Sequence, residues 1–166
     1  MTYSGFHLAQ VNIGRARGAM DEPVMAGFAA QLDAINALAD QDPGFVWRLQ
    51  TEDGDATAVR PYDDERIMIN LSVWADLASL RTFVFSSPHT GVMRHRREWF
   101  ERFPKAYVAL WWIPAGHRPT VAEAVARLEY LQAHGPTAHA FSFHEPYDPE
   151  GRPLERDSQW DECPTA

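Results

Sequence analysis

Residues 67–74 read IMINLSVW, in which every second residue is aliphatic and apolar. Successive side chains of a β-strand point to opposite faces, so this spacing predicts a strand whose odd-numbered positions form one wholly apolar face. The other face would carry Met68, Asn70, Ser72 and Trp74, which mix polar and large apolar groups. The segment is therefore predicted to be a strand with two chemically different faces.

Three further segments have the composition of strands. Residues 6–13 alternate weakly and are rich in strand-forming residues, and residues 107–113 form a dense aromatic and β-branched run. Residues 45–50 also alternate. Their odd-numbered positions are predicted to share one face: Phe45, Trp47 and Leu49. A short edge strand is expected at residues 140–143.

Four segments combine the apolar spacing of a helix with helix boundary signals. They are expected at about residues 23–41, 76–85, 87–103 and 121–134. Pro23 suits the first turn of the first helix, and Thr120 is the predicted N-cap of the last. The helices therefore alternate with the strands along the chain.

The order strand, helix, strand, strand, helix, strand is the split βαβ arrangement of a ferredoxin-like α+β domain, a sandwich in which helices cover one face of an antiparallel sheet. We expect this domain to span residues 1–144. The other face of the sheet would expose Trp and Phe side chains, and packing it against a second copy is the simplest way to bury them. The sequence therefore predicts a homodimer.

Residues 145–166 have a different composition from the rest of the chain. They contain seven acidic residues, two arginines and four prolines, and are predicted to form an arm ordered by contact or a disordered tail. The net charge is −8, of which −5 lies in this segment, so the remaining −3 leaves the domain nearly neutral. Such a domain lacks the basic footprint of a nucleic-acid or anionic-membrane partner. Without a long apolar run or an export signal, a cytoplasmic protein is expected.

Four segments carry a resemblance to a known family. They are DPGFVWRLQ at 42–50, FVFSSPHTGVMRHRREWF at 83–100, LWWIPAGHRPTVAEA at 110–124 and GPTAHAFSF at 135–143. Over roughly residues 5–145 the chain resembles the bacterial family called domain of unknown function 3291. That family resembles the dimeric α+β barrel superfamily, which includes cofactor-independent antibiotic-biosynthesis monooxygenases, small isomerases and lyases, and haem-binding relatives. The resemblance implies a dimeric α+β barrel fold and brings no catalytic motif to this chain.

Candidate catalytic residues come from the stretch PHTGVMRHRREWF at 88–100. At about 100° per residue, His89 and Arg96 fall within the apolar arc of the helix. Facing a pocket, His89 would act as general acid or base near neutral pH, and Arg96 would stabilise a carboxylate or developing oxyanion. In the structural alternative, His89 helps to cap the helix and Arg96 snorkels or pairs with a carboxylate.

Candidate binding residues are polar side chains that share strand faces with large apolar neighbours: Gln10, Asn12, Arg48, Asn70 and Ser72. If such a face lines a cavity, a few amides and hydroxyls orient a ligand inside an apolar wall. We select Asn70 as the orienting group, with Trp47 and Trp99 as enclosing walls. The alternative is a solvated edge or dimer contact for the polar residues, and core packing for the aromatic ones.

No metal site is predicted, because His89 and His95 lie about 120° apart around their helix and the other histidines lack a metal-binding spacing. A haem held by a single histidine stays open as an alternative, with His7, His89, His95 or His117 as the axial ligand.

The leading hypothesis is a small homodimeric protein that binds an apolar, aromatic or polyketide-like molecule and acts on it without a cofactor, as a monooxygenase or isomerase. One alternative is a non-catalytic dimer that binds a small molecule or a protein. The other is a haem-binding α+β barrel protein.

Overall fold

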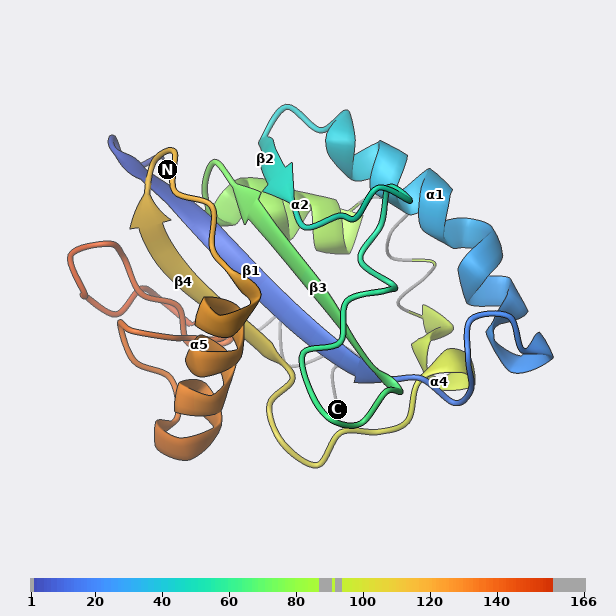
Figure 1. The fold of residues 1–166 in the computed structure, drawn as a ribbon. Coiled ribbons are helices and arrows are strands. Elements are labelled where there is room, and N and C mark those ends of the chain that lie inside the picture. Colours follow the sequence, from blue (N-terminus) through green and yellow to red (C-terminus); the bar gives the residue numbers. More distant parts are fainter. Residues whose placement is uncertain (1, 87–90, 92–93, 157–166) are drawn as a thin grey trace.

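The computed structural model describes residues 2–86, 91 and 94–156, and its centre is one antiparallel sheet of four strands in the order β2-β3-β1-β4 (Figure 1). The strands are β1 (Phe6–Arg15), β2 (Phe45–Arg48), β3 (Ile67–Trp74) and β4 (Val108–Pro114). The helices are α1 (Ala26–Asp40), entered through the 3-10 turn η1 (Pro23–Met25), α2 (Leu77–Ser86), α4 (Arg96–Trp99) and α5 (Val121–His134). This order and strand arrangement confirm the ferredoxin-like α+β fold.

The register of β1 gives the sheet two different faces. Ala9, Val11 and Ile13 join the core that includes Leu128 of α5. On the other face, Leu8 packs with residues of α1, α2 and β4. The polar residues of β1 and β3 lie on this second face, because Gln10 pairs with Ser72 and Asn12 with Asn70 across the strands. The sheet therefore presents its amides and hydroxyls to the side covered by α1 and α2.

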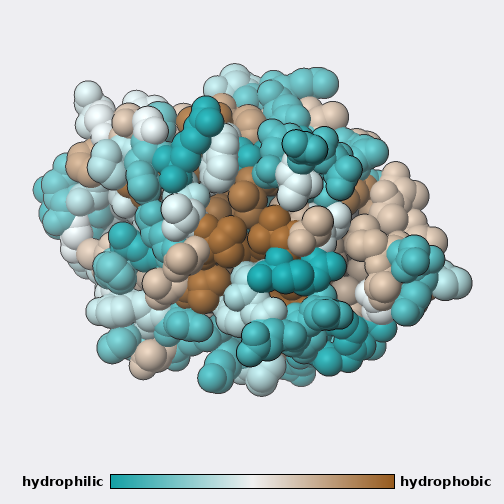
Figure 2. All heavy atoms as spheres, viewed as in Figure 1, coloured by the Kyte–Doolittle hydropathy of each residue, from teal (hydrophilic) through white to brown (hydrophobic). Residues whose placement is uncertain are grey.

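The position of α5 differs from the expected single layer of helices. α1 and α2 cover one face, whereas α5 and, from the connector at residues 51–66, Val59 and Tyr62 pack over the other (Figure 1). The sheet residues of that second layer are already buried within one chain, with Val11 and Val73 each 0% exposed. Figure 2 shows apolar side chains in a hollow on this face, and half-buried Leu49 and Ile67 adjoin the buried layer. The homodimer was predicted because a second copy would bury this face of the sheet. Since α5 already buries much of it, the homodimer stays a prediction.

A β-bulge in β2 corrects the predicted shared face of Phe45, Trp47 and Leu49. The pairing of β2 with β3 shifts between Phe45 and Trp47. One extra residue reverses the side-chain alternation that follows it. Phe45 therefore packs on the α1 and α2 side, while Trp47 and Leu49 pack on the α5 side.

The expected helix over 87–103 is not continuous: residue 94 is helical, His95 forms a turn, and α4 begins at Arg96. It is also shorter at its C-terminal end. α4 ends at Trp99 because Phe100 takes up extended backbone and forms a bridge with Ala16. The Glu101 N–H then donates to the carbonyl of Arg15 at 2.8 Å. Residues 87–90 and 92–93 of this prediction lie outside the described residues.

The segment after α5 is held against the edge strand β4. The expected edge strand at 140–143 is reduced to a bridge, in which Phe141 exchanges hydrogen bonds of 2.9 and 2.8 Å with Leu110. Trp112 Nε1 then donates to the carbonyl of Tyr147 at 2.7 Å. In the described part of the chain, no helix combines the length and hydropathy needed to cross a membrane.

Candidate functional site

A cleft lies between α1 and the polar face of the sheet, and it consists of two adjoining cavities. The first cavity has a volume of about 160 Å³ and is flanked by α4 and by residues 55–57 of the connector. The second cavity has a volume of about 90 Å³ and extends towards α2. The two share six lining residues: Asn12, Ile35, Asn36, Arg48, Asn70 and Val108. The two cavities are therefore neighbours on the same side of the sheet.

Arg96 brings a positive charge to the first cavity. Its Nη2 donates to the carbonyl of Ile13 at 3.1 Å, and its guanidinium lies 4.5 Å from the ring centre of Tyr107 and 5.1 Å from that of Phe100. Among the described residues, no carboxylate lies within ion-pair distance of Arg96. Burial lowers the pKa of Arg96, and the neighbouring Tyr107 opposes part of this shift. Aromatic rings and one carbonyl thus surround a charge that has no counter-ion among the described residues.

The structure brings together three of the five predicted site residues. Arg96, Asn70 and Trp99 all line the first cavity. Trp99 is 5% exposed and packs against Phe28 of α1 with ring centres 5.7 Å apart. His89 lies outside the described residues.

Trp47 lies on the opposite side of the sheet from the cleft. It packs against the core beneath α5 and is not among the residues that line either cavity. The cause is the bulge in β2, which turns Arg48 rather than Trp47 towards the cleft.

Arg48 joins three elements at one end of the cleft. Its Nε donates to Asp40 Oδ1 at 2.8 Å, at the end of α1, and its Nη1 donates to the carbonyl of Gly54 at 2.6 Å. Because Arg48 lies on β2 and lines both cavities, these bonds hold the connector and α1 beside the cleft. Unlike Arg96, this guanidinium already has a carboxylate partner.

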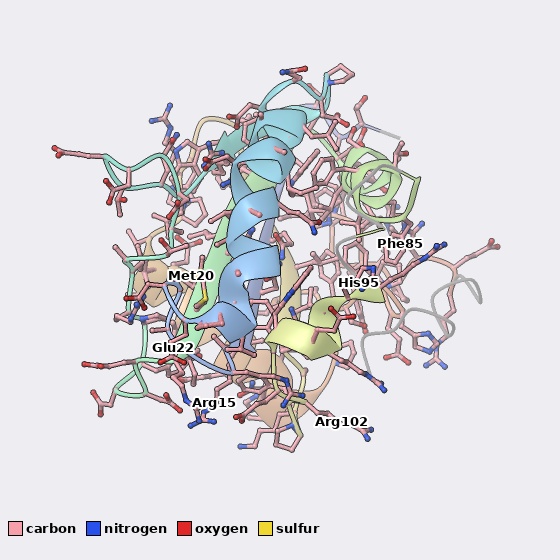
Figure 3. All side chains as sticks on the ribbon, turned by 90° about the vertical axis from the view of Figure 1, so that its right-hand side faces the viewer. Arg15, Met20, Glu22, Phe85, His95 and Arg102 are labelled. Carbon is pink, nitrogen blue, oxygen red and sulfur yellow. The ribbon has the colours of Figure 1, made fainter. Side chains whose placement is uncertain are left out.

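Sequence reasoning missed the contribution of α1. Phe28, Leu32 and Ile35 belong to the apolar spacing by which this helix is predicted, and they line the first cavity together with Gln31 and Asn36. Figure 3 views the molecule from the side on which α1 lies in front of the sheet, with α4 beside its first turns. The sequence feature that could have indicated this role of the helix is Asn36, a polar residue next to its apolar stripe.

The second cavity contains a chain of buried hydrogen bonds. Trp74 Nε1 donates to Ser72 Oγ at 3.0 Å, and Ser72 Oγ donates to Gln10 Oε1 at 2.9 Å. All three residues line this cavity, and each is less than a tenth exposed, with Gln10 at 6%. The chain gives each of the three groups a fixed orientation.

The described histidines named as haem ligands do not fit that role. His95 lies 2.9 Å from Glu98 and His117 lies 2.8 Å from Glu123, both with partly exposed side chains. His7, His95 and His117 are absent from the lining of both cavities. Within the described ranges, no three His, Cys, Asp or Glu side chains are grouped closely enough to hold a metal ion.

The sequence model of the family described as domain of unknown function (DUF3291) matches residues 7–157. The chain belongs to this family. No curated protein matches the sequence of this DUF3291 chain.

Several solved structures resemble the DUF3291 chain at low identity. SnoaB, a cofactor-independent oxygenase from Streptomyces nogalater, has a TM-score of 0.41 at 20% identity, with 69% of this chain and 95% of that chain covered. Rv0793 from Mycobacterium tuberculosis has a TM-score of 0.44 at 14% identity, covering 69% and 99%. A monooxygenase from the gene ActVA-Orf6 of Streptomyces coelicolor, in complex with nanaomycin D, has a TM-score of 0.40 at 8% identity, covering 70% and 91%.

Proposed function

We propose that this DUF3291 protein binds a small, largely aromatic molecule with an acidic group in the cleft, and acts on it without a bound cofactor, as a monooxygenase or isomerase. The observation that carries the proposal is Arg96, a half-buried cation that lines an apolar cavity and has no carboxylate partner among the described residues. A charge in such surroundings is stabilised by an anionic ligand. Asn70 and Trp99 would orient and enclose this ligand.

Both reactions need stabilisation of an anionic intermediate. In the isomerase, a proton leaves one carbon of the substrate and returns to another, with an enolate between the two steps. In the monooxygenase, the enolate carbon reacts with dioxygen, so that a CH₂ group and O₂ become C=O and water. Arg96 would stabilise the enolate oxygen in either case, since fixed donors in a partly dry site interact strongly with developing charge. His89 stays the proposed general acid or base.

The charge requirement is tested with 2-naphthoate and its neutral analogue 2-naphthylmethanol, by isothermal titration calorimetry. A charge-assisted hydrogen bond contributes about 1.5–3 kcal/mol, so Arg96→Met should weaken naphthoate binding by roughly 10- to 100-fold. The affinity for the neutral alcohol should change less than about 3-fold. The matched control is Arg102→Met, because Arg102 is exposed and lies outside both cavities (Figure 3). Equal naphthoate affinity in the wild type and Arg96→Met would disprove the proposal.

A second candidate function is ligand binding without catalysis. Among the described lining residues of the first cavity there is no histidine, and the only carboxylate is Asp55. Asp55 Oδ1 already accepts hydrogen bonds from Thr57 N at 2.8 Å and Thr57 Oγ1 at 2.6 Å. Asp55 is therefore the only carboxylate or imidazole base among these residues, and one of its two oxygens is already engaged by Thr57.

The catalytic and the non-catalytic function are distinguished by the fate of a small molecule that stays bound to the protein during purification. Native mass spectrometry identifies it, and incubation in air and D₂O then reports turnover. The monooxygenase adds one oxygen and removes two hydrogens, whereas the isomerase introduces deuterium. His89→Ala should abolish either change while the folded protein still binds the molecule. An unchanged molecule after incubation with the wild type would support the non-catalytic function.

A further inference from the structure

The hydrogen-bond chain in the second cavity has a direction that follows from its chemistry. An indole N–H donates and accepts nothing, so Ser72 Oγ must be the acceptor for Trp74. The hydroxyl proton of Ser72 remains free, and in the structure it is donated to Gln10 Oε1 at 2.9 Å. The carbonyl oxygen of the Gln10 amide therefore faces Ser72, and its NH₂ group faces the other way.

The chain is held rigidly by the fold. Gln10 and Ser72 are paired residues of β1 and β3, and Trp74 is two residues further along β3. Trp74 is 2% exposed, with its ring centre 5.5 Å from that of Phe45 and 4.9 Å from that of Phe83. The packed rings hold the Trp74 indole in place, and the pairing of β1 with β3 holds Ser72 opposite Gln10. The Gln10 amide therefore has this orientation before any ligand arrives.

The NH₂ group of Gln10 has no acceptor in the described part of the chain. Gln10 is 6% exposed and lines the second cavity, but only its Oε1 takes part in a hydrogen bond with a described residue. The second cavity therefore contains a preoriented donor beside the apolar side chains of Leu80 and Phe83.

We propose that Gln10 Nε2 recognises a carbonyl oxygen, or a similar neutral acceptor, on the ligand whose acidic group lies at Arg96. The inference rests on the proposed function and defines the ligand further. Arg96 binds the carbonyl of Ile13, next to Gly14, which lines the first cavity. Residues 10 and 14 share a strand face and are separated by about 14 Å at roughly 3.4 Å per residue. The ligand is thus a rigid apolar acid with an uncharged carbonyl at its far end.

The test compares two probes of nearly equal shape, 6-acetyl-2-naphthoate and 6-isopropyl-2-naphthoate, by isothermal titration calorimetry. One neutral hydrogen bond contributes about 1 kcal/mol, so the wild type should bind the acetyl probe about 5-fold more tightly. Gln10→Met should remove this preference, with both probes binding at similar affinity. The control Gln41→Met should retain it, because Gln41 is exposed and outside both cavities.

Ser72→Ala provides a second variant that keeps the Gln10 amide but removes the hydroxyl that orients it. The preference for the acetyl probe should fall while binding of the isopropyl probe is retained, and circular dichroism checks that each variant is folded. Equal affinities for both probes in the wild type, or a preference that survives Gln10→Met, would overturn the inference and leave the role of Arg96 intact. Failure of 2-naphthoate and both probes to bind the wild type would overturn both proposals.

Discussion

Gly14 allows β1 to pass beside the aromatic wall of the first cavity. A Cβ at this position would lie 2.7 Å from Phe100 Cδ1 and 3.3 Å from Arg96 Nη2. Real side chains do not approach so closely, and Phe100 is 7% exposed, so its ring has little room to move. The absence of a side chain at residue 14 therefore allows Phe100 and the end of Arg96 to lie this close to β1.

We predict that Gly14→Ala lowers the free energy of unfolding by about 1–3 kcal/mol, because the added methyl group forces a packed ring to shift. The measurement is urea denaturation followed by tryptophan fluorescence. Gly91→Ala is the control, since a Cβ at Gly91 meets nothing within 4 Å. Equal losses in the two variants would contradict this account of Gly14.

At the scale of elements, Glu123 adds a polar link to the apolar packing that holds α5 on the sheet. Thr120 Oγ1 accepts a hydrogen bond from the Glu123 N–H at 3.1 Å, which confirms the predicted N-cap. The carboxylate of Glu123 accepts from Trp111 Nε1 of β4 at 3.0 Å and lies 2.8 Å from His117 Nε2. Burial alone would raise the pKa of Glu123, but the bonds to His117 and Trp111 lower it.

A lowered carboxylate pKa means that ionised Glu123 stabilises the folded state. This contribution is complete above the unfolded pKa of about 4.3 and is lost as the pH falls through the lower folded value. We predict that Glu123→Gln lowers the free energy of unfolding by about 1 kcal/mol at pH 7. The difference from the wild type should shrink below about pH 4.

Chemical denaturation at a series of pH values measures this difference. Glu129→Gln is the control on the same helix, because Glu129 is exposed and none of the hydrogen bonds or ion pairs of the described residues involves it. A loss of stability in Glu123→Gln that is the same at pH 3 and pH 7 would show that ionisation of Glu123 is not the cause.

At the scale of the whole molecule, α5 and the connector cover only part of the sheet face that they share. α5 and the connector leave a hollow with apolar side chains between them (Figure 2). A second copy packed on this side would bury the half-buried residues around it, including Leu49 and Val59.

We predict a homodimer, which native mass spectrometry would detect at 37.6 kDa, twice the chain mass of 18.8 kDa. Val59→Glu should increase the proportion of single chains, because a buried unpaired charge opposes association. Val24→Glu is the control, since Val24 is 41% exposed and does not belong to the layer beneath α5. A single-chain mass at all protein concentrations would refute the dimer.

The sequence by itself determined the strands, the helix order and hence the ferredoxin-like fold. Local periodicity suffices for this, because the alternation at Ile67–Trp74 and the stripe at Phe28 and Leu32 are each set by neighbours in the chain. The same periodicity placed Asn70 beside Ser72 on one strand face. It also placed Arg96 on the apolar side of its helix.

Only the tertiary structure decided what these faces meet. The bulge after Phe45, which moved Trp47 away from the cleft, depends on pairing with β3 and leaves no mark in the alternation. The side of the sheet taken by α5, and the meeting of Arg96 with Ile13, depend on contacts between residues far apart in the chain. The orientation of the Gln10 amide likewise exists only once β1 and β3 are paired, because its partner Ser72 lies 62 residues away.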